Sequence, residues 1–348
     1  MRIAIFHDLP SGGAKRSLFE QVMRLSKRYS CDVYTLSSAD HSYSDMQSLV
    51  HKQEIFEFHP HRLFHSPFGR LNQAQRWLDL LNLDTLGKKI AQEIDNKVYD
   101  VVYAHPCQWT QAPLIIRHLK TPVVYYLQEP PRHLYQEAWQ KSAIGWRGWL
   151  DKLDPLLALY RRTARHLDRS ATLASQRVLV NSRFMQAAVK EIYGISPQVC
   201  YPGVDTEVFH PIPIPVENFV LSVGAIHSAK GFDSIIQSLR LINPEQRPAL
   251  RIVGNMTDKS ESKRLQAIGN ECGVTLQIEV NLSQEQLVER YNQCRFFVYA
   301  PHNEPFGLTP LEAMACGKTV VGVNEGGVRE TIVDGVTGRL VPRDPEQI

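Results

Sequence analysis

Two glutamates, Glu304 and Glu312, lie on either side of a turn that joins a short apolar run to a helix-like segment. The apolar run, 296–300, is typical of a buried strand. Thr309 is placed to cap the helix and Pro310 to occupy its first position. The unpaired N–H groups and partial positive charge of a helix N-terminus favour negatively charged ligands. We therefore expect an anion to bind beyond the carboxyl end of this strand.

The two glutamates allow two interpretations. Seven residues separate them, which is not a helical repeat, so Glu304 belongs to the loop and Glu312 to the helix, and both can converge on one ligand. In the other interpretation, Glu312 completes a capping box with Thr309, and Glu304 is a solvated loop charge. These residues alone do not decide between the two.

A lysine precedes the helix that we expect from Phe232. It is Lys230, which follows the strand-like run 219–223 and a loop that begins at Gly224. A lysine at the N-terminal edge of a helix opposes the helix dipole unless an anion is shared between them. We therefore favour Lys230 as a phosphate ligand over a solvated bystander.

A glycine pair, Gly12 and Gly13, follows the first strand-like run, 2–6, and precedes a helix. Glycines at such a turn let the backbone approach a phosphate or a sugar closely, although they also serve simply to make a tight turn. The chain contains no G-x-G-x-x-G. An NAD- or flavin-binding protein therefore has no support from this turn.

Polar residues also follow two later strand-like runs. His105 follows one of them, and the cluster Gln128, Glu129 and Arg132 follows the next. Short apolar strands that alternate with helical stretches predict an α/β fold, with parallel sheets covered by helices on both faces. Ligands of such sheets bind beyond the carboxyl ends of the strands. A lone histidine at a strand end is more often structural, so both a binding and a structural role stay open for His105.

The stretch E-P-F-G-L-T-P-L-E, followed by A-M-A-C-G-K-T-V-V and G-G-V-R-E, resembles the nucleotide-sugar-binding signature of the GT4 family of retaining glycosyltransferases. The resemblance extends over nearly the whole chain. It implies a GT-B fold, in which two Rossmann-like, doubly wound parallel-sheet domains face an interdomain cleft. It also implies that Glu304 faces the hydroxyls of the donor sugar and that Glu312 holds the ribose. The backbone N–H groups around Gly307, Leu308 and Thr309 would receive the diphosphate.

The resemblance assigns further residues, with two departures from the family. Gly12-Gly13 matches the N-terminal glycine loop, and Lys230 matches a lysine on the donor diphosphate, but Ala225 replaces the accompanying arginine. Residues 128–132 resemble the H-x-P-P-R segment of a GT4 subgroup that includes mannosyltransferases of surface-polysaccharide assembly. Gln128 replaces the histidine there, and an amide cannot exchange a proton. The acceptor-binding candidates are His105, Gln128, Glu129 and Arg132.

The length of 348 residues suits two domains, and 43% hydrophobic with 22% charged residues is typical of a globular protein. The proline-rich stretch 199–217 predicts a linker. It would join an N-terminal Rossmann-like acceptor domain, 1–198, to a C-terminal Rossmann-like donor domain, 218–348. We expect the C-terminal crossover helix of the family to be absent or trimmed.

Composition limits the other classes of function. Six scattered cysteines without a C-x-x-C pair predict neither a zinc site nor disulfides, and a net charge of +3 does not indicate nucleic-acid binding. The first apolar run is too short for a signal peptide, and no run approaches the ~20 apolar residues of a membrane span. We therefore expect a cytoplasmic protein. The basic, tryptophan-containing segment 139–183 can lie on an anionic membrane surface or be an ordinary helix with solvated arginines, and we favour the second.

Together, these features predict a retaining glycosyltransferase that transfers a sugar from GDP-mannose or a UDP-sugar to a glycan, lipid-linked or small-molecule acceptor. No D-x-D motif occurs, so we expect neither a metal nor a cofactor. Lys230 and the helix N-terminus would stabilise the departing diphosphate, and Glu304 would orient the sugar. The replacements at Gln128 and Ala225 leave an alternative, a nucleotide-sugar-binding protein of the same fold that has lost turnover.

Overall fold

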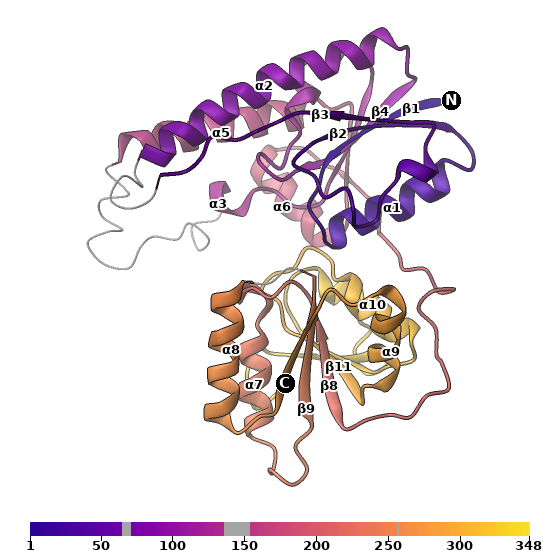
Figure 1. Ribbon diagram of the computed structural model, residues 1–348, viewed down its shortest axis with the longest axis vertical. Helices are drawn as coiled ribbons and strands as arrows, with labels where there is room; N and C mark the ends of the chain where they lie inside the picture. The colour runs from indigo at the N-terminus through magenta and orange to yellow at the C-terminus, as the bar shows by residue number, and fades with distance from the viewer. Residues whose placement is uncertain (65–70, 136–153, 256–257) are drawn as a thin grey trace. The chain divides into compact units, whose positions relative to one another are not determined.

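The computed structural model describes residues 1–64, 71–135, 154–255 and 258–348 (Figure 1). The chain divides into two compact units. The first unit consists of Met1–Asn181 and Met185–Cys200, and the second of Ser182–Phe184 and Tyr201–Ile348.

The first unit contains a seven-stranded sheet in the order β3-β2-β1-β4-β5-β6-β7, and its strands pair in parallel. The strands are β1 (Arg2–Asp8), β2 (Ser30–Leu36), β3 (Lys52–Phe56), β4 (Val101–Cys107), β5 (Val123–Leu127), β6 (Arg177–Val180) and β7 (Gln198–Val199). The helices are α1 (Gly13–Leu25), α2 (Asn72–Asn96), α3 (Arg132–Tyr135), α5 (Pro155–Ala174) and α6 (Arg183–Tyr193), with short 3-10 turns η1 (Gln47–Leu49) and η3 (Leu114–Arg117).

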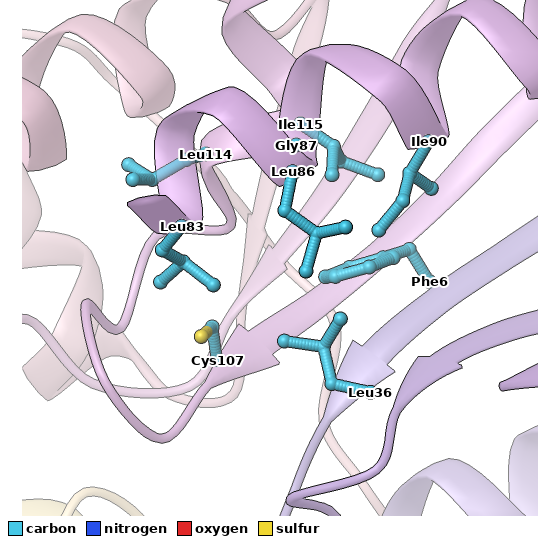
Figure 2. A pocket seen from close by; sticks show the side chains of 9 residues that line it. All are labelled: Phe6, Leu36, Leu83, Leu86, Gly87, Ile90, Cys107, Leu114 and Ile115. Carbon is cyan, nitrogen blue, oxygen red and sulfur yellow. The ribbon is translucent and has the colours of Figure 1, made fainter. Parts of the chain in front are cut away.

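Helix α1 covers one face of this sheet, and alternate residues of β1 point toward it. Ile3 and Ile5 pack against Leu18 and Val22 of α1 in one buried cluster. On the other face, α2 packs against α5 and η3 (Figure 1). Gly87 allows the approach of α2, since a Cβ there would lie 3.1 Å from the backbone nitrogen of the facing η3 residue. A small apolar pocket remains between α2, η3 and the sheet (Figure 2).

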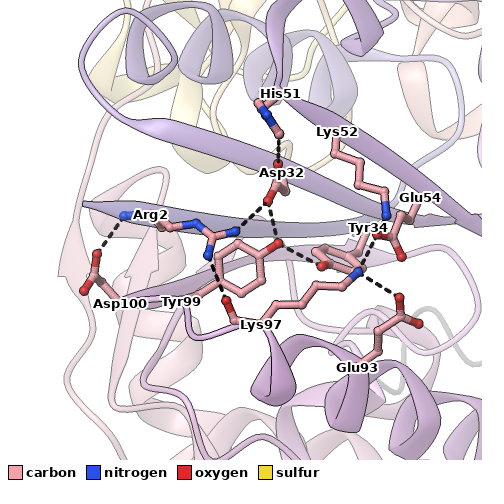
Figure 3. A network of polar contacts seen from close by, with 10 residues as sticks. All are labelled: Arg2, Asp32, Tyr34, His51, Lys52, Glu54, Glu93, Lys97, Tyr99 and Asp100. Carbon is pink, nitrogen blue, oxygen red and sulfur yellow. Dashed lines mark hydrogen bonds and ion pairs between the residues drawn. The ribbon is translucent and has the colours of Figure 1, made fainter.

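A polar network lies at the amino-terminal edge of the first sheet (Figure 3). The buried carboxylate of Asp32 accepts a hydrogen bond of 2.5 Å from the hydroxyl of Tyr99 and pairs with Arg2 at 3.5 Å. The Tyr99 hydroxyl also lies 2.8 Å from that of Tyr34. Ligands of parallel sheets bind at the opposite, carboxyl edge, so this network stabilises the fold and does not form the site.

The second unit contains a six-stranded sheet in the order β10-β9-β8-β11-β12-β13, again paired in parallel. The strands are β8 (Phe219–Val223), β9 (Ala249–Gly254), β10 (Leu276–Val280), β11 (Phe296–Tyr299), β12 (Val320–Val323) and β13 (Gly338–Val341). The helices are α7 (Phe232–Arg240), α8 (Lys259–Cys272), α9 (Gln284–Gln293) and α10 (Leu308–Ala315), with 3-10 turns η5 (Ser228–Lys230) and η6 (Gly326–Glu330).

Helices cover both faces of the second sheet (Figure 1). Ile235 of α7 and Leu265 of α8 belong to the buried cluster on one face. Tyr291 of α9 and Ala313 of α10 belong to the cluster on the other face. The predicted doubly wound α/β architecture with parallel sheets is therefore confirmed for each unit. Helix α9 begins with a full capping box, in which Ser283 accepts a hydrogen bond from the backbone nitrogen of Gln286.

Candidate active site

Each sheet reverses its strand order at one place. In the first unit the reversal lies between β1 and β4, and in the second it lies between β8 and β11. The crevice beyond the carboxyl ends of the strands at such a switch point is where doubly wound sheets bind ligands. The candidate residues of the second unit, Lys230 and Glu304, follow β8 and β11 and therefore meet at its switch point.

Lys230 and Glu304 form an ion pair. The Lys230 ammonium donates to both carboxylate oxygens of Glu304 at 2.8 Å. The two side chains are 23% and 26% exposed, so the pair is partly accessible to a ligand. The two residues proposed for the donor site are thus in direct contact with each other.

Three glycines hold the loop that carries Glu304. An added Cβ would lie 2.1 Å from the carbonyl oxygen of Ala300 at Gly231, 2.5 Å from that of Glu304 at Gly326, and 2.1 Å from that of Pro305 at Gly327. Gly231 and Gly326 also have a positive φ of 64°, which favours glycine. The loops after β8, β11 and β12 therefore contact one another backbone to backbone. The G-G-V-R-E motif was recognised from the sequence, but this packing function of its glycines was not.

Arg343 supports the same loop, and sequence reasoning missed it. Its guanidinium donates to the carbonyl oxygens of Ala300 at 2.7 Å and Pro301 at 2.9 Å. It also makes two bonds of 2.9 Å to the carboxylate of Glu325. Two of these four bonds go to backbone atoms more than forty residues away, and no local pattern indicates such partners.

The N-terminus of α10 lies next to this loop, but its cap differs from the predicted one. The helix begins at Leu308, its N-cap is Gly307 with a φ of 98°, and no side chain caps it. Thr309 is therefore inside the helix, and the predicted N-cap at Thr309 with a capping box to Glu312 is wrong. The hydroxyl of Thr309 is buried and has no hydrogen-bond partner. The first turn of α10 thus presents uncapped N–H groups, as an anion site requires.

The side chain of Glu312 is buried and contacts helix α9 of the second unit. It is 2% exposed, and its carboxylate accepts a hydrogen bond of 2.7 Å from the hydroxyl of Tyr291 on α9. Its proposed contact with the ribose stays a prediction.

The candidates of the first unit lie around the N-terminal half of α1 and the end of β5. Gly12 is the N-cap of α1, and Gly13 is its first residue. The side-chain amide of Gln128 donates to the carbonyl oxygen of Ala14 at 3.3 Å. Gln128 therefore contacts the first turn of α1, directly after the glycine pair. Its acceptor-binding role stays a prediction.

The other first-unit candidates differ in exposure. Glu129 and Arg132 form an ion pair, and Arg132 begins α3. His105 is fully buried, and its ring centroid lies 4.6 Å from that of Tyr103 and 5.3 Å from that of Tyr126. Burial lowers the pKa of His105 to about 3, so the ring is neutral. This environment favours the structural role of His105, while acceptor binding by Glu129 and Arg132 stays a prediction.

The described residues were searched for metal-ligand groups and for helices that could span a membrane. Among the described residues, no group of three or more His, Cys, Asp or Glu side chains could hold a metal ion. None of the described helices combines the length and apolar character needed to cross a membrane. The three tryptophans of 139–183 lie outside the described residues. Within α5, Arg165 donates to the carbonyl oxygen of Leu134 and Arg169 to that of Ile192, so these two cations are engaged by the fold.

The pocket behind the first sheet is not a substrate site. Its lining is apolar, with Phe6 and Leu36 from the strands and Leu83 and Ile90 from α2 (Figure 2). A sugar or a phosphate needs polar partners. The two switch points are therefore the candidate sites.

Comparison with known families decides what kind of protein carries these sites. Residues 206–348 match the model of glycosyl transferases group 1, and residues 11–208 match that of Glycosyltransferase Family 4. The chain belongs to glycosyltransferase family 4. The resemblance read from the signature around Glu304 is thereby confirmed.

Curated relatives of this family 4 chain are more distant. It is 28% identical over 196 residues to the D-inositol 3-phosphate glycosyltransferase of Xylanimonas cellulosilytica, a match that covers 50% of this chain and 46% of that protein. It is 29% identical over 224 residues to the human alpha-1,3/1,6-mannosyltransferase ALG2, covering 56% and 54% of the two chains. The chain therefore spans about half the length of the curated relatives it matches.

Solved structures similar to this family 4 chain share its fold. One is Anabaena HepE in complex with UDP-glucose, at 20% identity and a TM-score of 0.73, covering 99% of this chain and 86% of that one. Another is the sucrose-phosphate synthase of Thermosynechococcus elongatus, at 17% identity and a TM-score of 0.72, covering 99% and 87%. With the two parallel sheets, these likenesses confirm the predicted GT-B fold.

Proposed function

We propose that this family 4 chain is a retaining, metal-independent glycosyltransferase that moves a hexose from GDP-mannose or a UDP-sugar to a glycan, lipid-linked or small-molecule acceptor. The observation that carries the proposal is the contact between Lys230 and Glu304 at the switch point of the second sheet, beside the uncapped first turn of α10. The names of its relatives support the donor class, since HepE was solved with UDP-glucose and ALG2 is a mannosyltransferase.

The chemistry explains why a cation and a helix N-terminus belong together there. When the bond between the anomeric carbon and the diphosphate breaks, the electron pair leaves with the diphosphate, and positive charge develops on the sugar. Lys230 and the N–H groups of Leu308 and Thr309 would stabilise the growing negative charge. Glu304 would accept hydrogen bonds from the sugar hydroxyls. The acceptor oxygen then bonds to the anomeric carbon on the face that the diphosphate left, and its proton leaves with the diphosphate.

Two replacements favour a second candidate function, nucleotide-sugar binding without turnover. Ala225 stands where the family has a second cation for the diphosphate, and Gln128 stands where a subgroup has a histidine. Both changes remove groups that would act in the reaction, whereas Lys230, Glu304 and the first turn of α10 remain at the donor site of the second unit.

A donor screen separates the two functions. The protein is incubated with GDP-mannose, UDP-glucose, UDP-galactose and ADP-glucose, with and without EDTA, and donor binding, donor hydrolysis and transfer to a panel of acceptors are measured. The proposal expects binding of one donor class and transfer with retention at the anomeric carbon, unaffected by EDTA. Tight binding without hydrolysis or transfer would favour the binding protein, and loss of activity with EDTA would contradict metal independence.

A further inference from the structure

Exposed apolar side chains gather at the N-terminal end of α2 in the first unit. Phe64, Leu71 and Leu78 are 45%, 47% and 43% exposed. Leu71 is the N-cap of α2 and has helical φ and ψ angles, and Leu78 follows about two turns later, so the two share one face of the helix. The backbone nitrogen of Phe64 donates to the side chain of Asn72 at 2.6 Å, and the Asn72 amide donates to the carbonyl oxygen of Phe64 at 3.0 Å. Phe64 is therefore held beside the first turn of α2.

Helix α5 extends this surface. It runs beside α2 (Figure 1), and the indole nitrogen of Trp77 on α2 donates to the hydroxyl of Thr163 on α5 at 3.1 Å. Leu159 lies one turn before Thr163, so it is also placed next to α2, and it is 44% exposed. We call Phe64, Leu71, Leu78 and Leu159 the apolar patch. Exposed apolar side chains that gather in this way often mark an interaction surface.

Arginines lie among the residues of the apolar patch. Arg62 lies two residues before Phe64, Arg76 belongs to the second turn of α2, and Arg162 follows Leu159 by three residues on α5. All three are exposed. Within the described part of the chain, none of these three guanidinium groups forms a hydrogen bond or an ion pair. We call them the patch arginines, and they are available to an external anion.

Acids do not balance these charges locally. Within 61–64, 71–83 and 154–166 the acidic residues are Asp79 and Asp154. Both carboxylates accept hydrogen bonds from backbone nitrogens, at 3.0 and 2.9 Å. Burial lowers the pKa of His133 on α3, and the positive charges of Arg161 and Arg76 lower it further. Charges from both helices therefore act together at this end of the first unit, which is positive where it exposes the apolar patch.

We propose that the apolar patch and the patch arginines bind the surface of a membrane that contains anionic lipids. The apolar side chains would enter the boundary between headgroups and acyl chains, and the long arginine side chains would reach the lipid phosphates. A protein partner fits less well, because charged residues are depleted at the centres of protein interfaces, whereas here arginines lie among the apolar side chains. Most of the apolar patch comes from α2 and the residues before it, and not from the tryptophan-containing segment 139–183.

Membrane binding bears on the acceptor as well. A protein held at a lipid surface meets lipid-linked molecules there, so this surface favours the lipid-linked acceptor over the soluble ones. That choice rests on the proposed function, whereas membrane binding itself does not.

Cosedimentation with vesicles tests the surface in the full chain, without any sugar donor. The vesicles contain phosphatidylcholine alone, or phosphatidylcholine with about one third phosphatidylglycerol, and binding is measured at low and at high salt. Wild type should bind the mixed vesicles about tenfold more tightly than the neutral ones, and salt should weaken this binding. Leu159→Asn, Phe64→Asn and Arg162→Gln should each weaken binding to mixed vesicles by about fivefold or more.

The matched controls replace an exposed leucine and an exposed arginine of the second unit. They are Leu241→Asn and Arg240→Gln, at the end of α7. Both should bind vesicles as wild type does. Each replaced side chain in the patch and in the controls is exposed, so every variant should melt close to wild type.

Several outcomes would overturn the proposal. They are no binding of wild type to mixed vesicles, equal binding to neutral and mixed vesicles, and binding that Leu159→Asn and Phe64→Asn leave unchanged, which would show charge attraction alone. Sedimentation velocity without vesicles tests the other occupant, since a dimer that Leu159→Asn dissociates would assign the patch to a contact between two copies. If wild type binds vesicles as expected but transfers no sugar, the membrane surface stands and the proposed function fails. Transfer to a soluble acceptor without vesicle binding would show the reverse.

Discussion

The ion pair between Lys230 and Glu304 gives opposite expectations for its two partners. Lys230→Met removes the cation that would bind the diphosphate, whereas Glu304→Gln releases that cation from its bond within the protein. Affinity for UDP or GDP, which carry no sugar, should therefore fall in the first variant and rise or stay unchanged in the second. Transfer of sugar should fall in both.

The magnitudes follow from the geometry of the pair. A charge-assisted hydrogen bond contributes about 1.5–3 kcal/mol, which is roughly 10–150-fold in affinity. Lys230 already makes two bonds of 2.8 Å to Glu304, and part of that interaction is lost when a phosphate binds. We therefore expect the lower end of the range, about tenfold weaker binding for Lys230→Met. Each side chain is about one quarter exposed, between surface and buried pairs, so the unfolding free energy should fall by about 1–2 kcal/mol.

Calorimetric titration with UDP and GDP and thermal unfolding measure these effects. The matched control is Arg251→Met, which breaks the 2.8 Å ion pair between Arg251 and Glu217 elsewhere in the second unit. The control should lose stability and keep its affinity for nucleoside diphosphates. If Lys230→Met and Glu304→Gln lower that affinity equally, the pair only holds the loop, and the reasoning is refuted.

Three further predictions concern a glycine contact, a buried acid and the carboxylate of α10. Gly327→Ala places a Cβ 2.1 Å from a facing carbonyl oxygen. The rate of sugar transfer should therefore fall by about tenfold or more, and the melting temperature should drop. The control is Gly203→Ala, whose added Cβ meets nothing within 4 Å, and it should behave as wild type. Burial raises the pKa of Asp168 to about 6, above its unfolded value of about 3.9, so the folded state holds this proton more tightly than the unfolded state. The unfolding free energy of wild type should therefore fall by up to about 3 kcal/mol between pH 4 and pH 6. Denaturant unfolding of Asp168→Asn should lack this pH-dependent loss, and a pH profile identical to that of wild type would contradict the prediction. Glu312→Ala should weaken nucleotide-sugar binding by more than about tenfold. Tyr291→Phe removes the same 2.7 Å hydrogen bond but keeps the carboxylate, so it should leave binding near that of wild type. Equal losses of affinity in calorimetry would show that Glu312 acts only by packing within the second unit.

The sequence was sufficient for the class of fold and for the placement of Lys230 and Glu304 after neighbouring strands. Alternation of short apolar strands with helices predicted parallel sheets, and polar residues after strands predicted where Lys230 and Glu304 lie. The order of the strands could not be predicted from the sequence, because β1 pairs with β4 across more than ninety residues. Such pairing depends on packing of the whole unit and not on a local pattern.

The error at Thr309 has a local cause. A threonine followed by a proline and, three residues on, by a glutamate is a strong capping pattern. Gly307 adopts a φ of 98°, which starts the helix before the threonine. The resulting position leaves Glu312 too far into the helix to act as a cap, and its carboxylate bonds to Tyr291 instead. A positive φ at glycine depends on the loops around it, and the sequence does not encode those loops locally.

The buried basic residues of the first unit were also missed. Lys15 and His7 lie close to the glycine pair Gly12-Gly13 in the sequence, and neither was given a role. Lysine is almost never fully buried without a partner, so the expected place for it was the solvated face of α1. Only the structure shows that it lies on the buried face.

The backbone contacts at Gly231, Gly326 and Gly327 bear on how this chain could be re-engineered. A mutant library that varies all the loops around the second-unit site would lose most of its members at these three positions, because even one methyl group forces the loops apart. Diversity is better directed at Ala225, in the loop after β8, and His302, in the loop after β11, since neither is among the nearest atoms to an added Cβ at the three glycines. A laboratory search for a new donor preference should therefore randomise such positions and hold the three glycines constant.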